Sequence, residues 1–188
     1  MNQRIAERVR QLRNEAGLSL DALASQCGVS RSMLSLIERG ESSPTAVLLE
    51  KVAHGLGATL ADLFQQAPAA PPAPVARAAD QAEWTDPGSG YCRRNLTPPG
   101  WQAPLQLVAV QFPPGARVAF DTAARAPVVH QQVWLQQGQL QITVGAHTHT
   151  LAAGDCLAMR LDQPTAFHNP GPDTAHYLVA LATQAGPG

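Results

Sequence analysis

Between Ser30 and Gly40, four polar side chains have the chemistry and spacing of a surface that hydrogen-bonds to nucleic acid. Arg31, Ser32, Ser35 and Arg39 recur at intervals of three and four residues, so they share one face of a helix. Arginine can donate two hydrogen bonds to guanine, and serine can contact any base. The remaining positions predict the buried face of the same helix: Val29, Met33, Leu34 and Ile37. A helix that enters a major groove requires this division.

A second set of candidate side chains lies in the C-terminal half, where apolar and polar residues alternate. Alternation places Val129, Gln131, Val133 and Leu135 on one face of a strand. The amide of Gln131 can donate and accept hydrogen bonds. His168, further along the chain, can bind a carboxylate or change its charge near neutral pH. These residues either line a pocket for a small organic effector or fill the core of a β domain.

The first 66 residues predict a bundle of five short helices. Apolar residues recur at helical spacing, and capping residues and glycines mark where each helix begins and ends. The first two span residues 4–16 and Leu20–Gln26, the third follows Ser30 and stops at Gly40, the fourth opens at Ser43-Pro44 and ends at Gly57, and a last short turn follows Thr59. The second and third helices, joined by a turn at Gly28, are candidates for a helix-turn-helix.

The N-terminal segment closely resembles the Cro/C1-type, or XRE, helix-turn-helix family. The resemblance covers residues 4–64, and several motifs agree in register: Gly17-Leu18-Ser19, Leu23-Ala24, Gly28-Val29-Ser30, Ile37-Glu38-Arg39-Gly40, Ser43-Pro44 and Leu56-Gly57. One position departs from the pattern, because Leu20 stands where many members have a glutamine that touches phosphate. The family implies a transcriptional regulator that binds double-stranded operator DNA.

The resemblance also implies a role for individual residues. Base edges would be contacted by Ser30, Arg31, Ser32, Ser35 and Leu36. Phosphates would be held by Arg39 and by backbone N–H groups from Ser43 to Thr45, at a helix N-terminus.

The N-terminal domain lacks the net positive charge that is usual for a DNA-binding domain. Residues 1–66 carry seven Lys or Arg and seven Asp or Glu, although the first 40 positions hold six basic and four acidic residues. Because phosphate neutralisation supplies much of the affinity for DNA, one such domain should bind weakly. We therefore expect a homodimer.

The composition changes sharply along the 188 residues and predicts two domains. Residues 1–66 contain one proline, residues 68–74 contain four, and the rest is rich in Val, Thr, Gly and Pro. We expect a DNA-binding domain at 1–66, an extended Ala/Pro-rich linker at 67–82 and a β-barrel sensor domain at 83–188.

Cysteine usage and hydropathy indicate the compartment. The three cysteines are far apart, which argues against a disulfide framework or a cysteine-based zinc site. The sequence has no run of 18 apolar residues, and its N-terminus lacks the apolar core of a signal peptide. We expect a cytoplasmic protein without a membrane partner.

Short strands separated by turns predict a small antiparallel barrel or jelly roll after Pro104. The expected strands are Leu105–Phe112, Arg117–Asp121, Val128–Leu135, Gly138–Val144, Thr148–Leu151, Asp155–Leu161 and Ala175–Leu181. The order Pro114-Gly115, Val133 to Gly138, Leu151 to Asp155 and Pro164 to Asn169 resembles the cupin fold over residues 101–182. Ahead of the barrel, Trp84 to Arg94 should form a strand that covers an edge or pairs across a dimer.

Many cupins hold a metal with two histidines and a glutamate from one motif and a histidine from another. Here Gln131 stands at the glutamate position, the histidine pair falls within Ala123–Ala126, and only His168 remains. Too few ligands are left for a catalytic metal, so we expect no cofactor, no metal and no catalytic residue. The resemblance places His168 near the face formed by Gln131, Val133 and Leu135, as an effector site.

Three hypotheses follow from the sequence. The first is a regulator that binds operator DNA and senses an unknown small molecule. The second is a cupin-type metal-dependent enzyme fused to a DNA-binding domain. The third is an antitoxin or adaptor whose barrel only dimerises.

Overall fold

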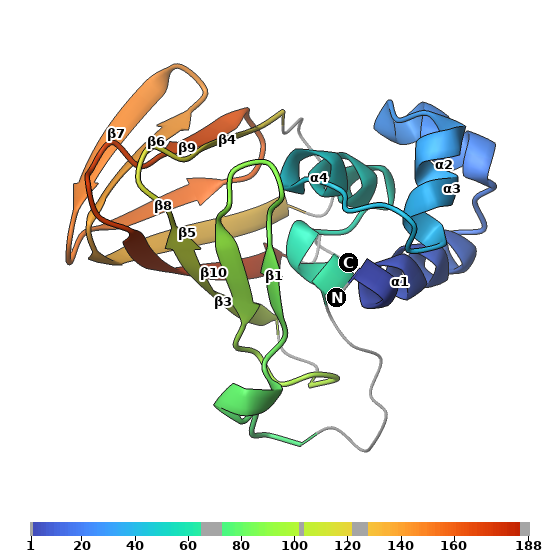
Figure 1. The fold of residues 1–188 in the computed structure, drawn as a ribbon, viewed down its shortest axis with the longest axis horizontal. Coiled ribbons are helices and arrows are strands. Elements are labelled where there is room, and N and C mark those ends of the chain that lie inside the picture. The colour runs from blue at the N-terminus through green and yellow to red at the C-terminus, as the bar shows by residue number, and fades with distance from the viewer. Residues whose placement is uncertain (1, 65–72, 102–103, 122–127, 185–188) are drawn as a thin grey trace. The chain divides into compact units, whose positions relative to one another are not determined.

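The computed structural model describes residues 2–64, 73–101, 104–121 and 128–184. They form two compact units, one of residues 1–75 with 98–101 and one of residues 76–97 with 102–188 (Figure 1). The first unit is helical and the second is built from strands.

The helical unit has four α-helices, α1 (Asn2–Glu15), α2 (Leu20–Cys27), α3 (Arg31–Glu38) and α4 (Ala46–Gly55). The prediction of five helices was wrong in its last member, because Leu60–Phe64 form a 3-10 helix, η1. The carbonyl of Thr59 accepts the N–H of Asp62, three residues on, and the Thr59 hydroxyl and the Asp62 carboxylate bond to each other. This reciprocal cap closes the tighter turn.

The start of α4 also differs from the prediction. The sequence indicated Ser43-Pro44, but Thr45 is the N-cap and α4 begins at Ala46. The Thr45 hydroxyl accepts the N–H of Leu48 at 3.3 Å, which satisfies one of the N–H groups that a helix start leaves without a partner in its own helix. The Ser43 hydroxyl instead accepts a hydrogen bond from the Asn2 amide at 2.9 Å.

One apolar core holds the four helices together. Its fully buried side chains come from every α-helix and from η1: Ile5, Val9, Leu23, Leu34, Ile37, Leu49, Val52 and Leu63. Each such side chain contributes about 1.5–3 kcal/mol relative to exposure. The spacing that predicted the helices is the spacing of this core.

The β unit consists of two antiparallel sheets (Figure 1). The strands are β1 (Glu83–Thr85), β2 (Cys92–Asn95), β3 (Leu105–Phe112), β4 (Arg117–Phe120), β5 (Val128–Gln137), β6 (Gln139–Val144), β7 (His147–Ala152), β8 (Cys156–Arg160), β9 (Thr165–His168) and β10 (Ala175–Gln184). The six-stranded sheet has the order β1-β2-β3-β10-β5-β8, and the four-stranded sheet has the order β4-β9-β6-β7. Short β9 was not predicted as a strand.

The jelly-roll interpretation is confirmed, but the barrel is not closed by hydrogen bonds. Each sheet keeps two edge strands, and packing across the interior joins the sheets. The rings of Phe167 on β9 and Tyr177 on β10 stack with centroids 6.3 Å apart, and Phe112 and Tyr177 meet edge to face. Inward side chains from two faces thus fill the core without continuous strand pairing.

The predicted edge-covering strand is a β-hairpin. Strand β2 pairs with β3, with Cys92 opposite Gln111, and β1 pairs with β2. Trp84 and Tyr91 point inward and meet edge to face at 6.0 Å. The hairpin therefore covers the β3 edge, as one alternative expected.

Part of the predicted linker, residues 67–72, lies outside the described residues. From residue 73 to the start of β1 at Glu83, the chain forms one 3-10 turn, η2 (Ala78–Asp80).

Candidate nucleic-acid interface

The turn between α2 and α3 is built on Gly28. Its φ of 63° and ψ of 31° are left-handed, a conformation that glycine adopts without steric cost. A Cβ at this position would meet nothing within 4 Å, so the constraint lies in the backbone alone. The N–H of Gly28 donates to the Ala24 carbonyl and ends α2. The chain then turns through Val29, which is buried, into α3.

Helix α3 divides its side chains as the sequence predicted. Leu34 and Ile37 are buried against the core, while Arg31 and Ser32 are exposed. The remaining predicted contacts lie on the outward side: exposed Arg39 and half-exposed Ser35 and Leu36. At about 100° per residue, Ser32, Ser35, Leu36 and Arg39 fall within one face of the helix. The fold therefore brings them together on a surface that a ligand can reach.

Arg31 lies at the side of this face, next to α2. Its Nε is 3.1 Å from the Asp21 carboxylate, and both side chains are exposed, at 64% and 73%. An exposed ion pair of this kind contributes about 0–1 kcal/mol. Arg31 can therefore leave Asp21 for another acceptor at little cost.

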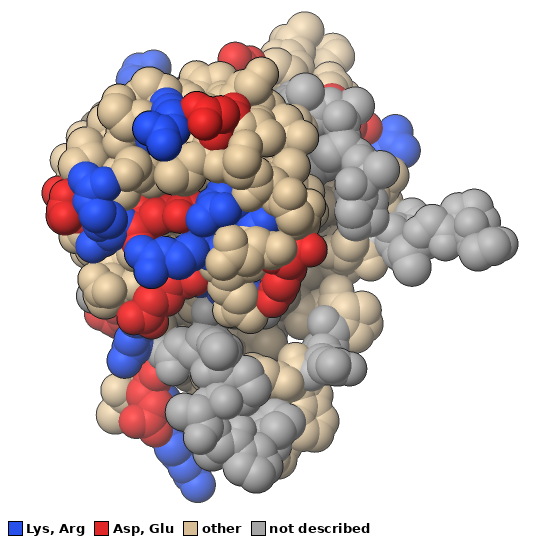
Figure 2. All heavy atoms as spheres, turned by 90° about the vertical axis from the view of Figure 1, so that its right-hand side faces the viewer, with Lys and Arg blue, Asp and Glu red and all other residues tan. Residues whose placement is uncertain are grey.

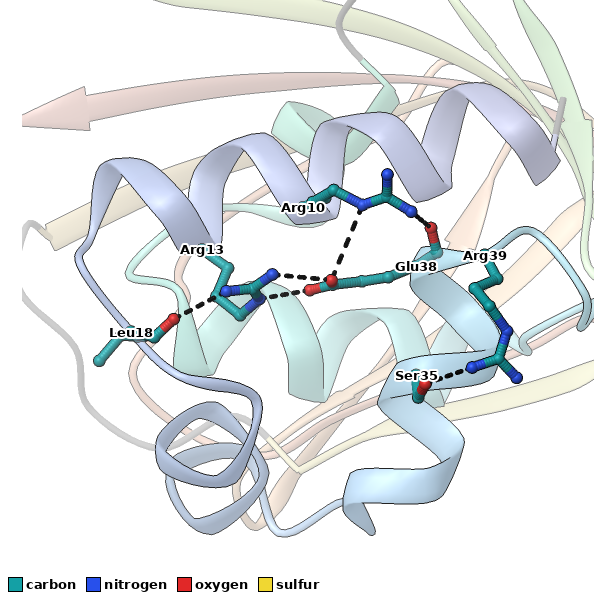
Figure 3. Close-up of polar contacts among 6 residues, drawn as sticks. All are labelled: Arg10, Arg13, Leu18, Ser35, Glu38 and Arg39. Carbon is teal, nitrogen blue, oxygen red and sulfur yellow. Dashed lines mark hydrogen bonds and ion pairs between the residues drawn. The ribbon is translucent and has the colours of Figure 1, made fainter.

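Arg39 has two partners at the end of α3. Its guanidinium donates to the Ser35 hydroxyl (Figure 3). It also donates to the Glu41 carboxylate at 2.8 Å. The hydrogen bond from Arg39 lowers the pKa of Glu41, and Glu41 raises the pKa of Arg39. Both groups are solvent-exposed, so this pair too is screened and exchangeable.

Three other predicted residues have structural hydrogen bonds of their own. The Ser30 hydroxyl caps α3 by accepting the N–H of Met33 at 3.2 Å, and it lies 3.1 Å from the Ser32 hydroxyl. Thr45 caps α4 and Ser43 accepts from Asn2, as described above. Ser30 and Ser43 are exposed and Thr45 is half-buried.

A buried carboxylate, Glu38, fixes α3 to α1 (Figure 3). Its side chain is only 6% exposed, and Arg13 binds it with two parallel hydrogen bonds of 2.6 and 2.9 Å. Arg13 also donates to the Leu18 carbonyl at 2.9 Å, and Arg10 donates to the backbone carbonyl of Glu38. The Glu38 hydrogen bond raises the pKa of Arg13. This cluster holds the orientation of the candidate recognition helix.

The sequence interpretation missed this cluster and counted Arg10 and Arg13 toward the basic excess. A signal was present, because Glu38 follows Leu34 by four residues and Ile37 by one, on the apolar side of α3. A carboxylate on a buried face requires a cationic partner. The basic residues that remain for a ligand are correspondingly fewer.

The surface of the helical unit is accordingly mixed in charge. Figure 2 shows Lys and Arg side chains interleaved with Asp and Glu rather than a continuous basic patch. The ion pairs of Arg31 with Asp21 and of Arg39 with Glu41 account for part of this pattern.

The β unit brings together three of the four predicted effector residues. Gln131, Val133 and Leu135 are buried on the inner face of β5, at 8%, 0% and 0% exposure. His168 does not join them, since its neighbour Phe167 points inward and adjacent residues of a strand face opposite sides. The predicted convergence of Gln131 and His168 was therefore wrong.

On the outer side of the four-stranded sheet, His168 has polar neighbours. Its Nδ1 lies 3.2 Å from the Gln141 side-chain oxygen, and Arg117 is its register partner on β4. Desolvation and, secondarily, the Arg117 charge lower the pKa of His168.

Among the described residues, no three His, Cys, Asp or Glu side chains are grouped so as to hold a metal ion. Ala123–Ala126, where the cupin histidine pair would fall, lie outside the described residues. No helix in the described ranges is long and apolar enough to cross a membrane.

A two-helix motif with a polar outward face, followed along the chain by an antiparallel jelly roll, defines a protein of the DNA-binding helix-turn-helix class. Residues 9–63 match the helix-turn-helix family HTH_3. The HTH-type transcriptional regulator SutR of Escherichia coli K12 is 30% identical over 169 residues, which cover 90% of this chain and 89% of SutR. The chain belongs to this family, the XRE-type helix-turn-helix transcriptional regulators.

Two further relatives agree with this assignment. SinR of Bacillus subtilis is 40% identical over 63 residues, 33% of this chain and 57% of SinR. The crystal structure of an HTH_3 family transcriptional regulator from Vibrio cholerae has a TM-score of 0.76 and 25% identity, and the match covers 98% of this chain and 97% of that one.

Proposed function

We propose that the protein reads operator DNA as a homodimer through the outward face of α3 and responds to a small organic effector in its β unit. The observation that carries the DNA-reading part is that Arg31 and Arg39 each form an exchangeable ion pair with an exposed carboxylate. Both arginines flank the outward face, and each is held only loosely by an exposed carboxylate.

The chemistry of binding is an exchange of partners. Arg31 leaves Asp21 and donates two hydrogen bonds to a guanine edge, while Arg39 leaves Glu41 and binds a phosphate. Ser32 and Ser35 contact bases, and the side chain of Leu36 contacts a thymine methyl group. Glu38, Arg13 and Arg10 keep α3 in place, so little ordering is needed when DNA arrives.

The effector site is proposed at the inner face of β5. Gln131 contributes an amide to a surface that is otherwise apolar, and this is the usual composition of a small-molecule site. His168 is not part of this proposal, because it lies on the opposite side of its sheet.

The test of DNA reading uses Arg31→Ala. Genome-wide footprinting of the wild-type chain first identifies the operator, and fluorescence anisotropy then compares variants on that duplex. We expect Arg31→Ala to weaken specific binding by about 1–3 kcal/mol. The matched control is Arg77→Ala, because Arg77 is also an exposed arginine but lies just before η2, outside the helical unit. Equal affinities of the wild type and Arg31→Ala would exclude Arg31 as a base reader.

The test of sensing uses Gln131→Leu, which preserves side-chain size and removes the amide. Thermal shift with a panel of small organic acids, sugars and amines identifies a ligand, since a compound that binds the native state raises the melting temperature. We expect Gln131→Leu to lose this shift and to keep DNA binding. Gln136→Leu, an exposed glutamine on the same strand, should keep both. Stoichiometric iron, manganese or zinc in the purified protein would contradict the sensor proposal.

A further inference from the structure

The outer face of the six-stranded sheet is apolar at its centre and exposed. Four large apolar side chains stand on it, Leu105 and Trp134 at 45% exposure, Val128 at 38% and Leu107 at 37%; Val128 lies at the end of β5 and the other three nearer the centre. Large apolar side chains at this exposure are individually common on protein surfaces, whereas a contiguous group marks an interaction site.

Strand register shows that the group is contiguous. On β10, Ala182 pairs with Leu105, Ala180 with Leu107, and Leu178 with both Ala109 and Trp134. Gln132 and Ala158 extend the Ala180 row across β5 and β8. We call this surface the apolar face and define it by its residues: Leu105, Leu107, Ala109, Gln132, Trp134, Ala158, Leu178, Ala180 and Ala182. All nine are uncharged.

The other sheet of the same unit supplies an internal comparison. Its outward positions in the described residues are polar, charged or alanine: Arg117, Ala119, Gln139, Gln141, Thr143, Thr148, Thr150, Ala152, Ala166 and His168. That sheet can face water without a cover. The six-stranded sheet would instead leave large apolar side chains in contact with water, which is unfavourable. The apolar face is therefore a specific property of one surface and not of the domain as a whole.

Its size is that of a protein–protein interface. Five strands, β2, β3, β10, β5 and β8, stand about 4.8 Å apart, and β5 presents an outward residue about every 6.8 Å. The whole outward surface is therefore up to about 800 Å², of which the apolar face is roughly the central half. A standard interface buries about 800 Å² per partner, with an uncharged centre and a polar rim.

The rim has the expected charge. Arg94 on β2 pairs with Glu83 at 3.6 Å, and Arg160 at the end of β8 pairs with Asp162 at 3.3 Å. The two ion pairs lie at opposite edges of the sheet, one near β1 and one on β8, and both are outside the apolar face.

The occupant must present an apolar surface of similar extent. Within residues 2–64 no large hydrophobic side chain is exposed, and the other described residues of the helical unit, 73–75 and 98–101, expose two, Val75 and Trp101. Two residues far apart in the sequence do not make a surface of the extent of the apolar face. That unit offers a surface of mixed charge instead. The surface that matches the apolar face in composition is the apolar face of another copy, and two-fold symmetry brings identical patches together.

We propose that two copies of this chain dimerise by packing their apolar faces against each other, with Leu107 and Trp134 as the central anchors. The dimer follows from the sheet surface, whereas its use in placing two α3 helices on two half-sites rests on the function proposed above. Face-to-face sheet packing at about 10 Å buries Leu105, Leu107 and Trp134 from both copies.

The test measures the mass of the full chain by sedimentation velocity over a range of micromolar concentrations. We expect the wild type to sediment at twice 19.8 kDa. Leu107→Glu and Trp134→Glu each place two carboxylates at the centre of the interface, and each should raise the dimer dissociation constant about 100-fold or more. The control is Val75→Glu, the same change at an exposed apolar residue off the sheet. Far-UV circular dichroism checks that every variant is folded.

A second measurement uses the wild-type chain without substitution. Cys156 is exposed and is the register partner of Trp134, at the edge of the apolar face. Its rate of reaction with a thiol reagent should fall as protein concentration rises through the dimer dissociation constant. In Leu107→Glu the rate should not depend on concentration.

The outcomes separate this inference from the proposed function. If the wild type is a monomer, or if the variants remain dimeric, the proposed interface is wrong. If the chain is found in a larger particle only when another protein is present, the apolar face binds that protein and the dimer proposal is also wrong. A dimer that Leu107→Glu dissociates, together with no sequence preference in footprinting, would support the interface and defeat the operator-reading proposal. Dimer formation, dissociation by both glutamates and an unchanged Val75→Glu would establish the inference.

Discussion

Replacing Glu38 by alanine tests whether the buried cluster orients the recognition helix. The substitution removes the acceptor of two Arg13 hydrogen bonds and leaves the guanidinium in a largely buried position, since the Arg13 side chain is only 15% exposed. Arg10 keeps its bond to the backbone carbonyl, so this contact survives the change. The loss is thus confined to the carboxylate.

Its magnitude follows from burial. Breaking a buried ion pair by removing one partner costs about 3–5 kcal/mol. Water can reach part of Arg13, so we expect a decrease of about 2–4 kcal/mol in the free energy of unfolding of the helical unit. A unit of this size is stable by about 3–10 kcal/mol in total. With a urea dependence near 1 kcal/mol per molar, the unfolding midpoint should fall by about 2–4 M.

The assay separates the two units by signal. All four α-helices lie within Asn2–Gly55, so ellipticity at 222 nm follows the helical unit. Two of the three tryptophans, Trp84 and Trp134, lie on β1 and β5, whereas Trp101 belongs to the helical unit. All variants are therefore compared in a Trp101→Phe background, in which the remaining fluorescence reports on the β unit. Glu38→Ala should shift the first transition and leave the second in place. Glu41→Ala, which removes an exposed carboxylate three residues further on, should shift neither.

A double variant decides between an ion pair and simple loss of packing. Arg13→Met with Glu38→Met replaces both partners by apolar side chains and should recover most of the lost stability, because no buried charge remains without a partner. A decrease below about 0.5 kcal/mol for Glu38→Ala would refute the reasoning. So would a double variant no more stable than Glu38→Ala.

Three further changes have defined outcomes. Gly28→Ala should lower the stability of the helical unit by about 1–2 kcal/mol in urea unfolding, because a left-handed φ strains alanine while its methyl group meets no neighbour; no loss would contradict the turn geometry. Asp21→Ala should change stability by less than about 1 kcal/mol and increase operator affinity in anisotropy, since Arg31 no longer has to leave an acceptor; weaker binding would contradict the exchange mechanism. His168 should titrate below 6.5 by NMR, because desolvation and Arg117 oppose its protonation. The unfolded chain then binds more protons, so the stability of the β unit should be full above pH 6.5 and decrease as pH falls from 6.5 toward the folded pKa, an effect that His168→Gln removes.

Local signals were enough to predict most of the helical unit. Caps and left-handed glycines act within a few residues, and Ser19, Ser30 and Gly28 mark the ends of α2 and α3 in the structure as in the sequence. The polar face of α3 was likewise predictable, because helical periodicity is local.

The Glu38 cluster was harder because it depends on tertiary packing. Arg13 and Glu38 are 25 residues apart, and nothing in their spacing indicates that α1 and α3 lie side by side. In the β unit, alternation correctly placed Gln131, Val133 and Leu135 inside. Applying the same rule to β9 would have put His168 on the side opposite Phe167, and so away from the inner face near which the cupin resemblance had placed it.

The balanced charge of the helical unit becomes intelligible once the partners of each arginine are known. Arg10 and Arg13 are committed to Glu38, and Arg31 and Arg39 are shielded by Asp21 and Glu41. In the proposed interface each arginine that contacts DNA therefore replaces an ion pair, and the net gain of electrostatic energy per arginine is small. Such a surface discriminates between sequences, because only a correctly placed acceptor repays the exchange.

The consequence for affinity is quantitative. A half-site dissociation constant of about 10⁻⁶ M is reasonable for a domain with so little net charge. If a second helical unit is linked at an effective concentration of about 10⁻³ M, the pair binds at about 10⁻⁹ M, which lies in the range of specific operators. The proposed pairing through the β unit would thus supply the affinity that the charge of a single helical unit does not.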